Sequence, residues 1–340
     1  MATDKKIINQ PFKQLRLTGN GQPEDVVELH DGVVTSLGPN EVLVEMEAAP
    51  IHISDFMLVG GVYGVKPSLP APLGAEGVGR VIDVGSGHVT EYLGKRVIIL
   101  PYYEQGTWAT HLVAPVKNLV IVDEGIEATQ LAQLTINAVT AFLTILDYSE
   151  LKPGDWIGQT AANSAVGRYV IGLAKINGWK TLNAVRRAES AEFVRSIGGD
   201  EVVIIGDDLD TQIEKALDGK QLDHILDTVG GTTIGTIAGF LKSRGSIVGY
   251  SSESGQTPVI HPLDLFYRRL HYHGFWVIDW FRITPKEQID NLIQHLSGLV
   301  GEGRLSATVG GTFSIEKYQE AFQAAKQPGR PGKYFFTFDH

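Results

Sequence analysis

Strand-like and helix-like segments alternate over roughly a hundred residues after position 155, and this alternation constrains the fold more than any other feature. Strand-like runs rich in apolar residues, at residues 156–161, 180–185 and 201–205, alternate with helix-like segments. Strands that are apolar throughout are typical of a parallel sheet covered by helices on both faces. The sequence therefore predicts an α/β fold with a doubly wound parallel sheet, which a further strand at residues 272–278 extends.

A second domain is predicted from the chain's length and from its two ends. A chain of 340 residues exceeds the usual size of one compact core. Residues 1–122 contain short β-type runs broken by Gly and Pro, and the tail after residue 308 returns to β character. We predict a mainly β domain made of residues 1–122 and 308–340, with the sheet domain of residues 123–307 inserted between them.

Composition excludes several classes of function. A formal charge of −10 argues against a general nucleic-acid binder, whose surface would be basic. The chain contains no cysteine, which removes disulfides, thiolate nucleophiles and Cys-based metal sites. The first residues resemble neither a signal peptide nor a transit segment, and we find no apolar stretch of membrane length. We therefore expect a cytoplasmic protein that binds neither nucleic acid nor membrane.

A phosphate-binding loop is predicted directly after the first strand of the alternating region. Ala162, Ser164 and Gly167 occupy the spacing of a G-x-G-x-x-G loop, and a helical pattern follows. Small residues let the backbone approach a pyrophosphate, and the helix N-terminus offers free N–H groups. The alternative is an ordinary strand-to-helix turn.

Two arginines stand where the next strand ends. NAD-binding domains place Asp or Glu there to bind the ribose hydroxyls, whereas this chain has Arg186 and Arg187. A guanidinium pair suits the 2′-phosphate of NADPH through charge-assisted hydrogen bonds. The sequence favours NADPH over NADH; the alternative is a solvated, cationic start to the following helix.

These segments are similar to those of a known family. The segment at residues 151–187 closely resembles the mitochondrial-type 2-enoyl thioester reductases, a zinc-free branch of the medium-chain dehydrogenase/reductase superfamily that also includes quinone oxidoreductases. Further matching segments, among them IHISDFMLVGGVYGVKP, GTWATHLV, LTINAVTAFLTIL and HGFWVIDW, follow in the family's order and cover nearly the whole chain. The resemblance implies a GroES-like catalytic domain and a Rossmann NADPH-binding domain.

The resemblance also implies roles for individual residues. Tyr63 in GVYGVKP matches the family's proton-donating tyrosine. The positions that match cofactor contacts, besides the two arginines, are Asn137, Asn163, Ser164, Ala165, Val166, Tyr250, Phe275, Trp276, Val277 and Lys333. The chain departs from the family in having Arg-Arg-Ala at residues 186–188, where Arg-Asp-Arg is common, and YSSES from residue 250, where YGG is common.

No metal site is expected. In zinc-dependent relatives a Gly-His-Glu motif supplies a ligand, but here Ala75 precedes Glu76. His52 lies near the position of another ligand, and we interpret it as a pocket or core histidine. We interpret His271 and His273, on one face of an expected strand, as packing or interface residues.

Three functions remain open from the sequence. The first is hydride transfer to the activated C=C bond of a 2-enoyl thioester or related enone, with the Tyr63 phenol supplying the proton. The second is a quinone or carbonyl reductase on the same scaffold, and the third is a non-catalytic NADPH-binding protein. Each implies a small-molecule ligand, and we expect a homodimer that pairs edge strands across a two-fold axis.

Overall fold

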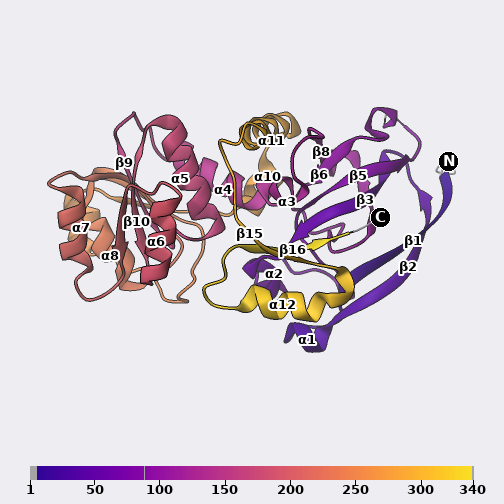
Figure 1. Cartoon of the computed structure of the whole chain (residues 1–340), viewed down its shortest axis with the longest axis horizontal. Helices are drawn as coiled ribbons and strands as arrows, with labels where there is room; N and C mark the ends of the chain where they lie inside the picture. Colours follow the sequence, from indigo (N-terminus) through magenta and orange to yellow (C-terminus); the bar gives the residue numbers. More distant parts are fainter. Residues whose placement is uncertain (1–5, 88, 339–340) are drawn as a thin grey trace. The chain divides into compact units, whose positions relative to one another are not determined.

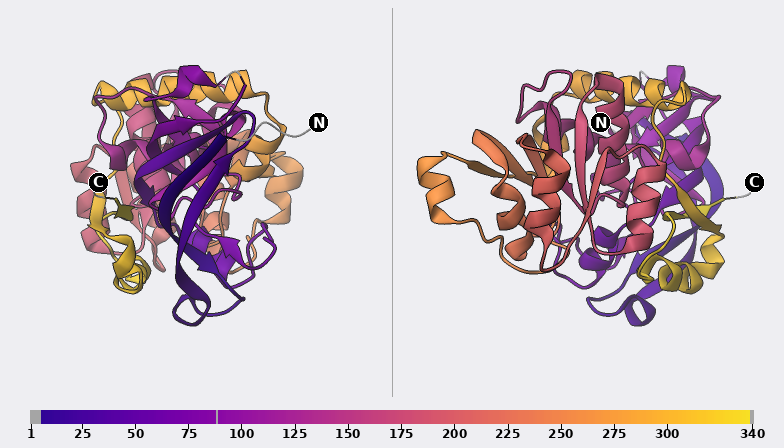
Figure 2. Two further views of the ribbon diagram at one scale, coloured as in Figure 1. Left: turned by 90° about the vertical axis from the view of Figure 1, so that its right-hand side faces the viewer. Right: turned by 60° about the vertical axis from the view of Figure 1, so that its left-hand side comes forward.

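The computed structural model describes residues 6–87 and 89–338. It contains two compact units, which are described separately. The unit called here the α/β unit comprises Asn137–Val277 and Arg304–Ser306, and the remaining described residues form the β unit. Figure 1 labels the helices and strands, and Figure 2 shows the same ribbon from two further directions.

The α/β unit contains one six-stranded sheet in which all neighbouring strands are parallel. Its spatial order is β11-β10-β9-β12-β13-β14, so the chain builds outward from β9 first to one edge and then to the other. This reversal is the switch point of a doubly wound sheet, where such folds bind their ligands. The strands are β9 (Trp156–Thr160), β10 (Lys180–Val185), β11 (Glu201–Ile204), β12 (Leu222–Asp227), β13 (Leu241–Gly249) and β14 (His271–Gly274).

Helices cover both faces of this sheet, as β10 illustrates. Leu182 and Ala184 pack in a core that includes side chains of α7 and α8, whereas Val185 packs with side chains of α5 and α6. Because successive strand residues point to opposite faces, one apolar strand supplies both cores. The predicted α/β class is confirmed. The helices are α4 (Val139–Leu146), α5 (Ala165–Asn177), α6 (Ala188–Ser196), α7 (Leu209–Leu217), α8 (Gly231–Ala238) and α9 (Pro262–Tyr267).

The β unit has two sheets. Three strands form one in the order β2-β1-β4, and the other has seven strands in the order β15-β16-β3-β5-β6-β8, with β7 also pairing with β3. The C-terminal strand β16 pairs antiparallel with β3, so the tail closes back on the N-terminal region as expected. The strands are β1 (Lys6–Leu17), β2 (Val27–Leu37), β3 (Glu41–Pro50), β4 (Ala71–Pro72), β5 (Gly77–Val84), β6 (Arg96–Ile99), β7 (His111–Pro115), β8 (Leu119–Ile121), β15 (Val309–Phe313) and β16 (Lys333–Thr337).

The core of the β unit is centred on a buried aromatic cluster. The Trp108 ring lies 5.3 Å from that of Phe322 and 5.4 Å from that of Phe336, measured between centroids, and its indole N–H donates to the Pro50 carbonyl. Trp108 comes from a loop in the N-terminal part of this unit, and the two phenylalanines come from α12 and β16 near the C-terminus. The cluster therefore joins the N-terminal and C-terminal parts of the unit. The remaining elements are α1 (Pro23–Val26), α2 (Ile53–Val59), η1 (Thr90–Tyr92), η2 (Val116–Asn118), α3 (Ala128–Leu131), η3 (Leu134–Ala138), α10 (Val277–Ile283), α11 (Lys286–Gly301), η4 (Ile315–Lys317) and α12 (Tyr318–Lys326).

Two features differ from the sequence-based expectations. The stretch Ala128–Leu146 has the length and hydropathy of a membrane span, which we did not predict; 72% of its window is buried, as in a core helix. The strand expected at residues 272–278 covers only His271–Gly274, and α10 begins at Val277.

The compact units also divide the chain differently from the predicted domains. Residues 123–136 and 278–303, which we assigned to the sheet domain, belong to the β unit. Helix α11 packs against α3, and the Gln294 side chain donates to the Ile121 carbonyl at the end of β8. These contacts place α11 with the β strands.

Candidate functional site

The predicted phosphate loop lies between β9 and α5, at the carboxyl edge of the parallel sheet. Ser164 caps α5, because its hydroxyl accepts a hydrogen bond from the Gly167 N–H at 3.1 Å. Ala165 and Val166 form the first turn of the helix, and the Asn163 carbonyl accepts from the Arg168 guanidinium at 3.2 Å. The loop therefore presents the N-terminus of a 13-residue helix at the switch point of the sheet.

Gly167 allows α5 to begin close to the loop that follows β9. A Cβ atom at this position would lie 2.5 Å from the Ala162 carbonyl oxygen, closer than side-chain atoms normally approach. Ala161, the residue before Ala162, adopts a left-handed conformation with φ of 47°. Only a glycine at position 167 lets the helix start this close to the loop backbone, as the small residues of a dinucleotide-binding loop do.

Arg186 and Arg187 follow β10 and are both exposed. The side chain of Arg186 is 75% exposed, and its nearest acidic partner is Glu253, with 3.9 Å between Nη2 and Oε2. Glu253 belongs to the YSSES segment after β13 and was not singled out in the sequence. The two arginines are thus available to a 2′-phosphate, while Glu253 offsets part of their charge.

Polar side chains support the same edge where β12 and β13 end. The Asp227 carboxylate accepts hydrogen bonds from the Thr160 hydroxyl at 3.0 Å and from the Tyr272 hydroxyl at 3.3 Å. Burial raises the pKa of Tyr272 to about 12, with Asp227 adding to the effect. Burial, and then the charge of Glu253, also raises the pKa of Tyr250, whose hydroxyl oxygen is buried. Both phenols therefore stay protonated and can act as hydrogen-bond donors.

The remaining predicted contacts of the α/β unit lie in separate places. Asn137 is buried within η3, a π-helical turn before α4. The Phe275 N–H donates to the Gly249 carbonyl at 2.9 Å, which places Phe275 beside the end of β13. Trp276 follows it and Val277 starts α10. Phe275 thus lies near Tyr250, whereas Asn137 belongs to a different stretch of the unit.

A buried polar cluster occupies the β unit and begins with His52, the N-cap residue of α2. The His52 backbone N–H donates to the Asp55 carboxylate at 2.7 Å, and His52 Nε2 lies 2.8 Å from Glu76 Oε1. Lys333 Nζ lies 3.1 Å from the other ring nitrogen, Nδ1. All four residues are buried.

Burial determines the protonation of this cluster. Burial, and after it the charge of Lys333, lowers the pKa of His52 to about 3. Burial also raises the pKa of Asp55 to about 6 and that of Glu76 to about 7. A neutral imidazole that accepts from the Lys333 ammonium at Nδ1 has its proton on Nε2, which faces Glu76. His52 is therefore a neutral link between one buried cation and one buried acid.

This arrangement does not fit a zinc ion. A zinc-binding histidine must direct a free ring nitrogen at the metal, but Lys333 and Glu76 face both ring nitrogens of His52. Among the described residues, no group of three or more His, Asp or Glu side chains is placed to hold a metal. Lys333, which the sequence predicts as a cofactor contact, directs its ammonium at His52 in this structure.

Glu76 also shapes the turn that carries Asn137. Its Oε2 accepts hydrogen bonds from the Thr135 hydroxyl and, at 2.9 Å, from the Ile136 N–H. A carboxylate that takes a backbone N–H competes with the i→i−4 ladder, and the chain forms a π-helical turn there. The sequence signal for this role was a charged residue directly before the apolar run of β5.

Tyr63 lies in the loop after α2, and its backbone N–H donates to the Met57 carbonyl at 3.1 Å. Its half-buried ring contacts that of Tyr103, with 5.8 Å between centroids and an angle of 54°. Both rings pack against the core of the β unit. Tyr103 could not be identified from the sequence, because nothing in PYYEQGTW distinguishes it from its neighbour Tyr102.

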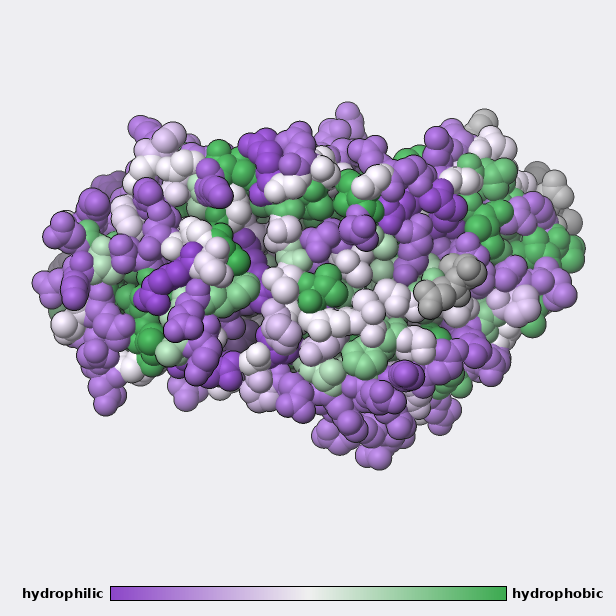
Figure 3. Space-filling view, in the orientation of Figure 1, coloured by the Kyte–Doolittle hydropathy of each residue, from purple (hydrophilic) through white to green (hydrophobic). Residues whose placement is uncertain are grey.

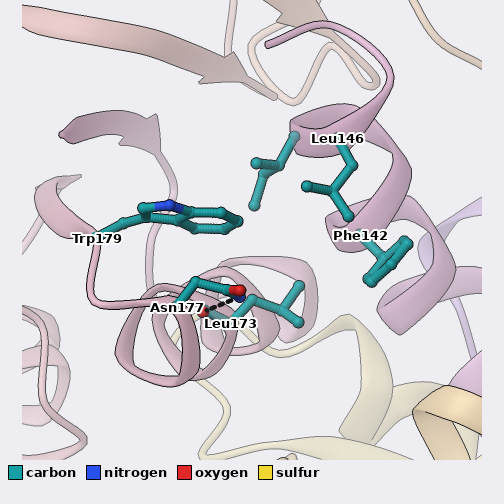
Figure 4. A pocket seen from close by; sticks show the side chains of 6 residues that line it. Phe142, Leu146, Leu173, Asn177 and Trp179 are labelled. Atoms are coloured by element: carbon teal, nitrogen blue, oxygen red, sulfur yellow. Dashed lines mark hydrogen bonds between the residues drawn. The ribbon is translucent and has the colours of Figure 1, made fainter. Parts of the chain in front are cut away.

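Two cavities lie in the α/β unit, and none of the predicted site residues lines either of them. Figure 4 shows the smaller, between α4 and α5, lined by apolar side chains such as Phe142 and Trp179, with Asn177 hydrogen-bonded to the Leu173 carbonyl. At about 10 Å³ it cannot hold a substrate. The larger, about 730 Å³, is a polar groove lined in part by His271 and His273. Their rings stack at 5.9 Å on one face of β14, as predicted.

Comparisons with known proteins cover nearly the whole chain. The family model described as alcohol dehydrogenase GroES-like domain matches residues 38–124, and that described as zinc-binding dehydrogenase matches residues 165–297. The mitochondrial enoyl-[acyl-carrier-protein] reductase of Bos taurus is 32% identical over 94% of this chain and 86% of its own. A Bacillus thuringiensis protein assigned as an NADPH:quinone reductase superposes with a TM-score of 0.88 at 25% identity, over 97% of this chain and 99% of that one. A solved complex of Etr1p with NADP and crotonyl-CoA superposes with a TM-score of 0.85 at 23% identity, over 96% and 100%.

Proposed function

Because the chain belongs to the family of the mitochondrial enoyl-[acyl-carrier-protein] reductases, within the medium-chain dehydrogenase/reductase superfamily, we propose that it is an NADPH-dependent reductase of 2-enoyl thioesters. The predicted superfamily is thereby confirmed. The observation that carries the proposal is Tyr63, a loop phenol backed by an aromatic partner in a chain without cysteine. A neutral phenol can hold the proton that such a reduction requires.

The cofactor is proposed from the residues of the α/β unit. The helix N-terminus at Ser164 and the tight loop that Gly167 permits suit a pyrophosphate, and Arg186 and Arg187 suit a 2′-phosphate. When bound, NADPH supplies the hydride that adds to the β-carbon of the substrate. The charge of that hydride moves to the thioester oxygen, giving an enolate.

The protein then completes the reduction by delivering a proton to the α-carbon. The O–H bond of Tyr63 breaks as the new C–H bond forms, and the enolate electron pair makes that bond. An unperturbed phenol has a pKa of about 10 and is protonated at neutral pH. Tyr63 is thus a general acid that needs no metal.

The test is NADPH oxidation with four substrates and two proteins. We expect wild type to reduce crotonyl-CoA, and Tyr63→Phe to lower kcat on it by roughly 10²–10⁴-fold while cofactor affinity changes little. Quinone reduction should be much less sensitive, because hydride adds directly to an electrophilic ring. An enone and a ketone complete the panel, and unchanged crotonyl-CoA turnover in Tyr63→Phe would remove Tyr63 from the mechanism.

The second candidate function is quinone reduction, which the resemblance to the Bacillus thuringiensis protein favours. It predicts good quinone turnover and no activity on any enoyl substrate. A non-catalytic NADPH-binding protein would bind the cofactor tightly and oxidise it with none of the four substrates. The same panel therefore separates all three functions.

Metal independence remains part of the proposal. Its support is the ring of His52, which contacts Lys333 and Glu76 rather than presenting a free nitrogen. Dialysis against a strong chelator should leave activity unchanged, with elemental analysis finding well under one zinc per chain. Stoichiometric zinc whose removal abolishes turnover would contradict this.

A homodimer is proposed from the edge of the parallel sheet. Within the described chain, β14 pairs only with β13 and leaves its other edge open. The neighbouring α9 exposes Leu263, Phe266 and Tyr267, the last two being 69% and 80% exposed. An open edge next to exposed apolar side chains is typical of a subunit contact.

Light scattering at micromolar concentration should give the mass of two chains. Phe266→Glu should shift it toward one chain, whereas Ile7→Glu should not, although Ile7 on β1 is also 80% exposed. Figure 3 shows that, on the face it presents, apolar side chains occur in small groups among hydrophilic ones. A monomeric wild type would contradict the proposal.

We also propose a cytoplasmic location, supported only by the sequence signals described above. The Bos taurus relative is named as mitochondrial. Imaging of the chain with a C-terminal fluorescent tag in its source cells distinguishes the two, and an organellar signal would overturn the proposal.

A further inference from the structure

We propose that Tyr103 is a positioning residue for Tyr63: its hydroxyl donates a hydrogen bond to the phenolic oxygen of Tyr63 while that oxygen gives up its proton. This inference rests on the proposed function and assigns a partner to its general acid. Both tyrosines belong to the β unit.

The two side chains already meet in the structure. Their ring centroids are 5.8 Å apart, and the Tyr103 hydroxyl has the side chains of Ser54 and Tyr63 as polar neighbours. The hydroxyl oxygen of Tyr103 is fully buried, yet it makes no hydrogen bond of ordinary geometry to any described residue. A buried donor without a good acceptor is unfavourable until an acceptor forms beside it. A phenolate at Tyr63 is such an acceptor.

The backbone of Tyr103 is held in an uncommon conformation. Its φ is 59°, in the left-handed region that bulky residues rarely adopt. The chain directly before it is held by a hydrogen bond from the Tyr102 N–H to the Leu100 carbonyl at 2.8 Å. Strain of this kind persists where the surroundings impose it, and it is concentrated at functional sites. Here it directs an aromatic side chain at Tyr63.

Protonation of Tyr103 agrees with a donor role. Burial, followed by the nearby charges of Asp55 and Tyr63, raises the pKa of Tyr103 well above its usual value. Its O–H bond therefore stays intact throughout the reaction. In the proton-transfer step the Tyr63 O–H bond breaks, the α-carbon gains the proton, and the negative charge moves to the Tyr63 oxygen. Tyr103 stabilises that oxygen by hydrogen bonding until a proton from solvent water restores the phenol.

The kinetic test compares Tyr103→Phe with Tyr102→Phe. The control variant removes a neighbouring hydroxyl that donates to the Phe281 carbonyl. We expect Tyr103→Phe to lower kcat on crotonyl-CoA roughly 10–100-fold, with KM and NADPH affinity nearly unchanged. The alkaline limb of its kcat profile should move to higher pH by about one unit, because Tyr63 loses a group that favours its ionised form. Tyr102→Phe should leave both the rate and the profile unchanged.

Two further results bear on the assignment. In a Tyr63→Phe background, Tyr103→Phe should cause no additional loss, because it acts through Tyr63. If wild type reduces crotonyl-CoA and Tyr63→Phe is impaired, but Tyr103→Phe has wild-type kcat and an unshifted profile, this inference is wrong and the proposed function stands.

A measurement independent of turnover separates the two proposals completely. The protein can be labelled with 13C at the ζ-carbon of its 11 tyrosines, and the Tyr63 resonance identified by its loss in Tyr63→Phe. Tyr63 should ionise at higher pH in Tyr103→Phe than in wild type, by about one unit. An identical ionisation midpoint in both proteins would overturn the inference, whatever substrate the enzyme reduces.

Discussion

The polar residues of the two units differ in how far the protein itself satisfies them. In the β unit, Lys333, His52 and Glu76 form a buried chain whose members face one another, and burial shifts the pKa values of the histidine and the acid. In the α/β unit, Arg186 and Arg187 extend into solvent from the end of β10. The buried residues of the β unit hydrogen-bond or pair with one another, whereas the two arginines of the α/β unit have hydrogen-bond donors that face solvent.

This difference indicates where binding energy comes from. A buried network is already paired in the free protein, so a ligand gains little by contacting it. Exposed guanidinium groups gain most when a dianion replaces water in front of both. The α/β unit should therefore determine cofactor affinity, and the buried chain should determine stability and its pH dependence.

The largest expected effect comes from removing both exposed arginines. Arg186→Ala with Arg187→Ala should weaken NADPH binding on the order of 100-fold, since two charge-assisted hydrogen bonds contribute about 2–3 kcal/mol. NADH, which lacks the 2′-phosphate, should bind almost as before. Titration calorimetry with both cofactors measures the contrast, with at least tenfold preference for NADPH expected in wild type. If wild type bound NADPH and NADH with equal affinity, the two arginines would not contribute to cofactor binding.

Glu76→Gln should have the next largest effect. It should change how the free energy of unfolding depends on pH. The pKa of Glu76 is raised to about 7, so the folded state holds a proton that the unfolded chain releases near pH 4.5. Stability from this group is full below that pH and is lost as pH rises toward 7. Glutamine keeps an acceptor for the Ile136 N–H but cannot ionise. Between pH 5 and 8 the variant should gain about 2–3 kcal/mol of stability relative to wild type.

Urea denaturation of the cofactor-free proteins at several pH values provides the measurement for Glu76→Gln. His52 titrates in the opposite direction, because its lowered pKa makes stability increase with pH. The comparison must therefore be the difference between variant and wild type at each pH, in which the histidine contribution largely cancels. A constant difference across the range would show that Glu76 keeps an ordinary pKa.

The extent to which the sequence predicted these two regions follows from the range of the contacts involved. Most strands of the parallel sheet and the loop at Ser164 depend on neighbours in the chain, and local pattern was sufficient to predict them. The link between Lys333 and His52 joins residues 281 positions apart, and no local pattern reports it. Tyr103 depends on a left-handed backbone that is set by its surroundings. The early end of β14 at Gly274 was missed because a short apolar run fits a strand and a helix equally well.

The smallest expected effect concerns Glu253, the acid 3.9 Å from Arg186. This carboxylate partly neutralises the cation in the free protein and would repel an approaching 2′-phosphate. Because the Arg186 side chain is 75% exposed, solvent screens the pair, and removing it should change the binding free energy by less than about 1 kcal/mol. Glu253→Gln should therefore tighten NADPH binding about two- to fivefold and leave NADH unchanged, with the gain shrinking as salt is added. Glu189→Gln, on the neighbouring helix α6, is the matched control for loss of one negative charge. If Glu253→Gln instead weakened both cofactors equally, the glutamate would be a ribose contact rather than a competitor for Arg186.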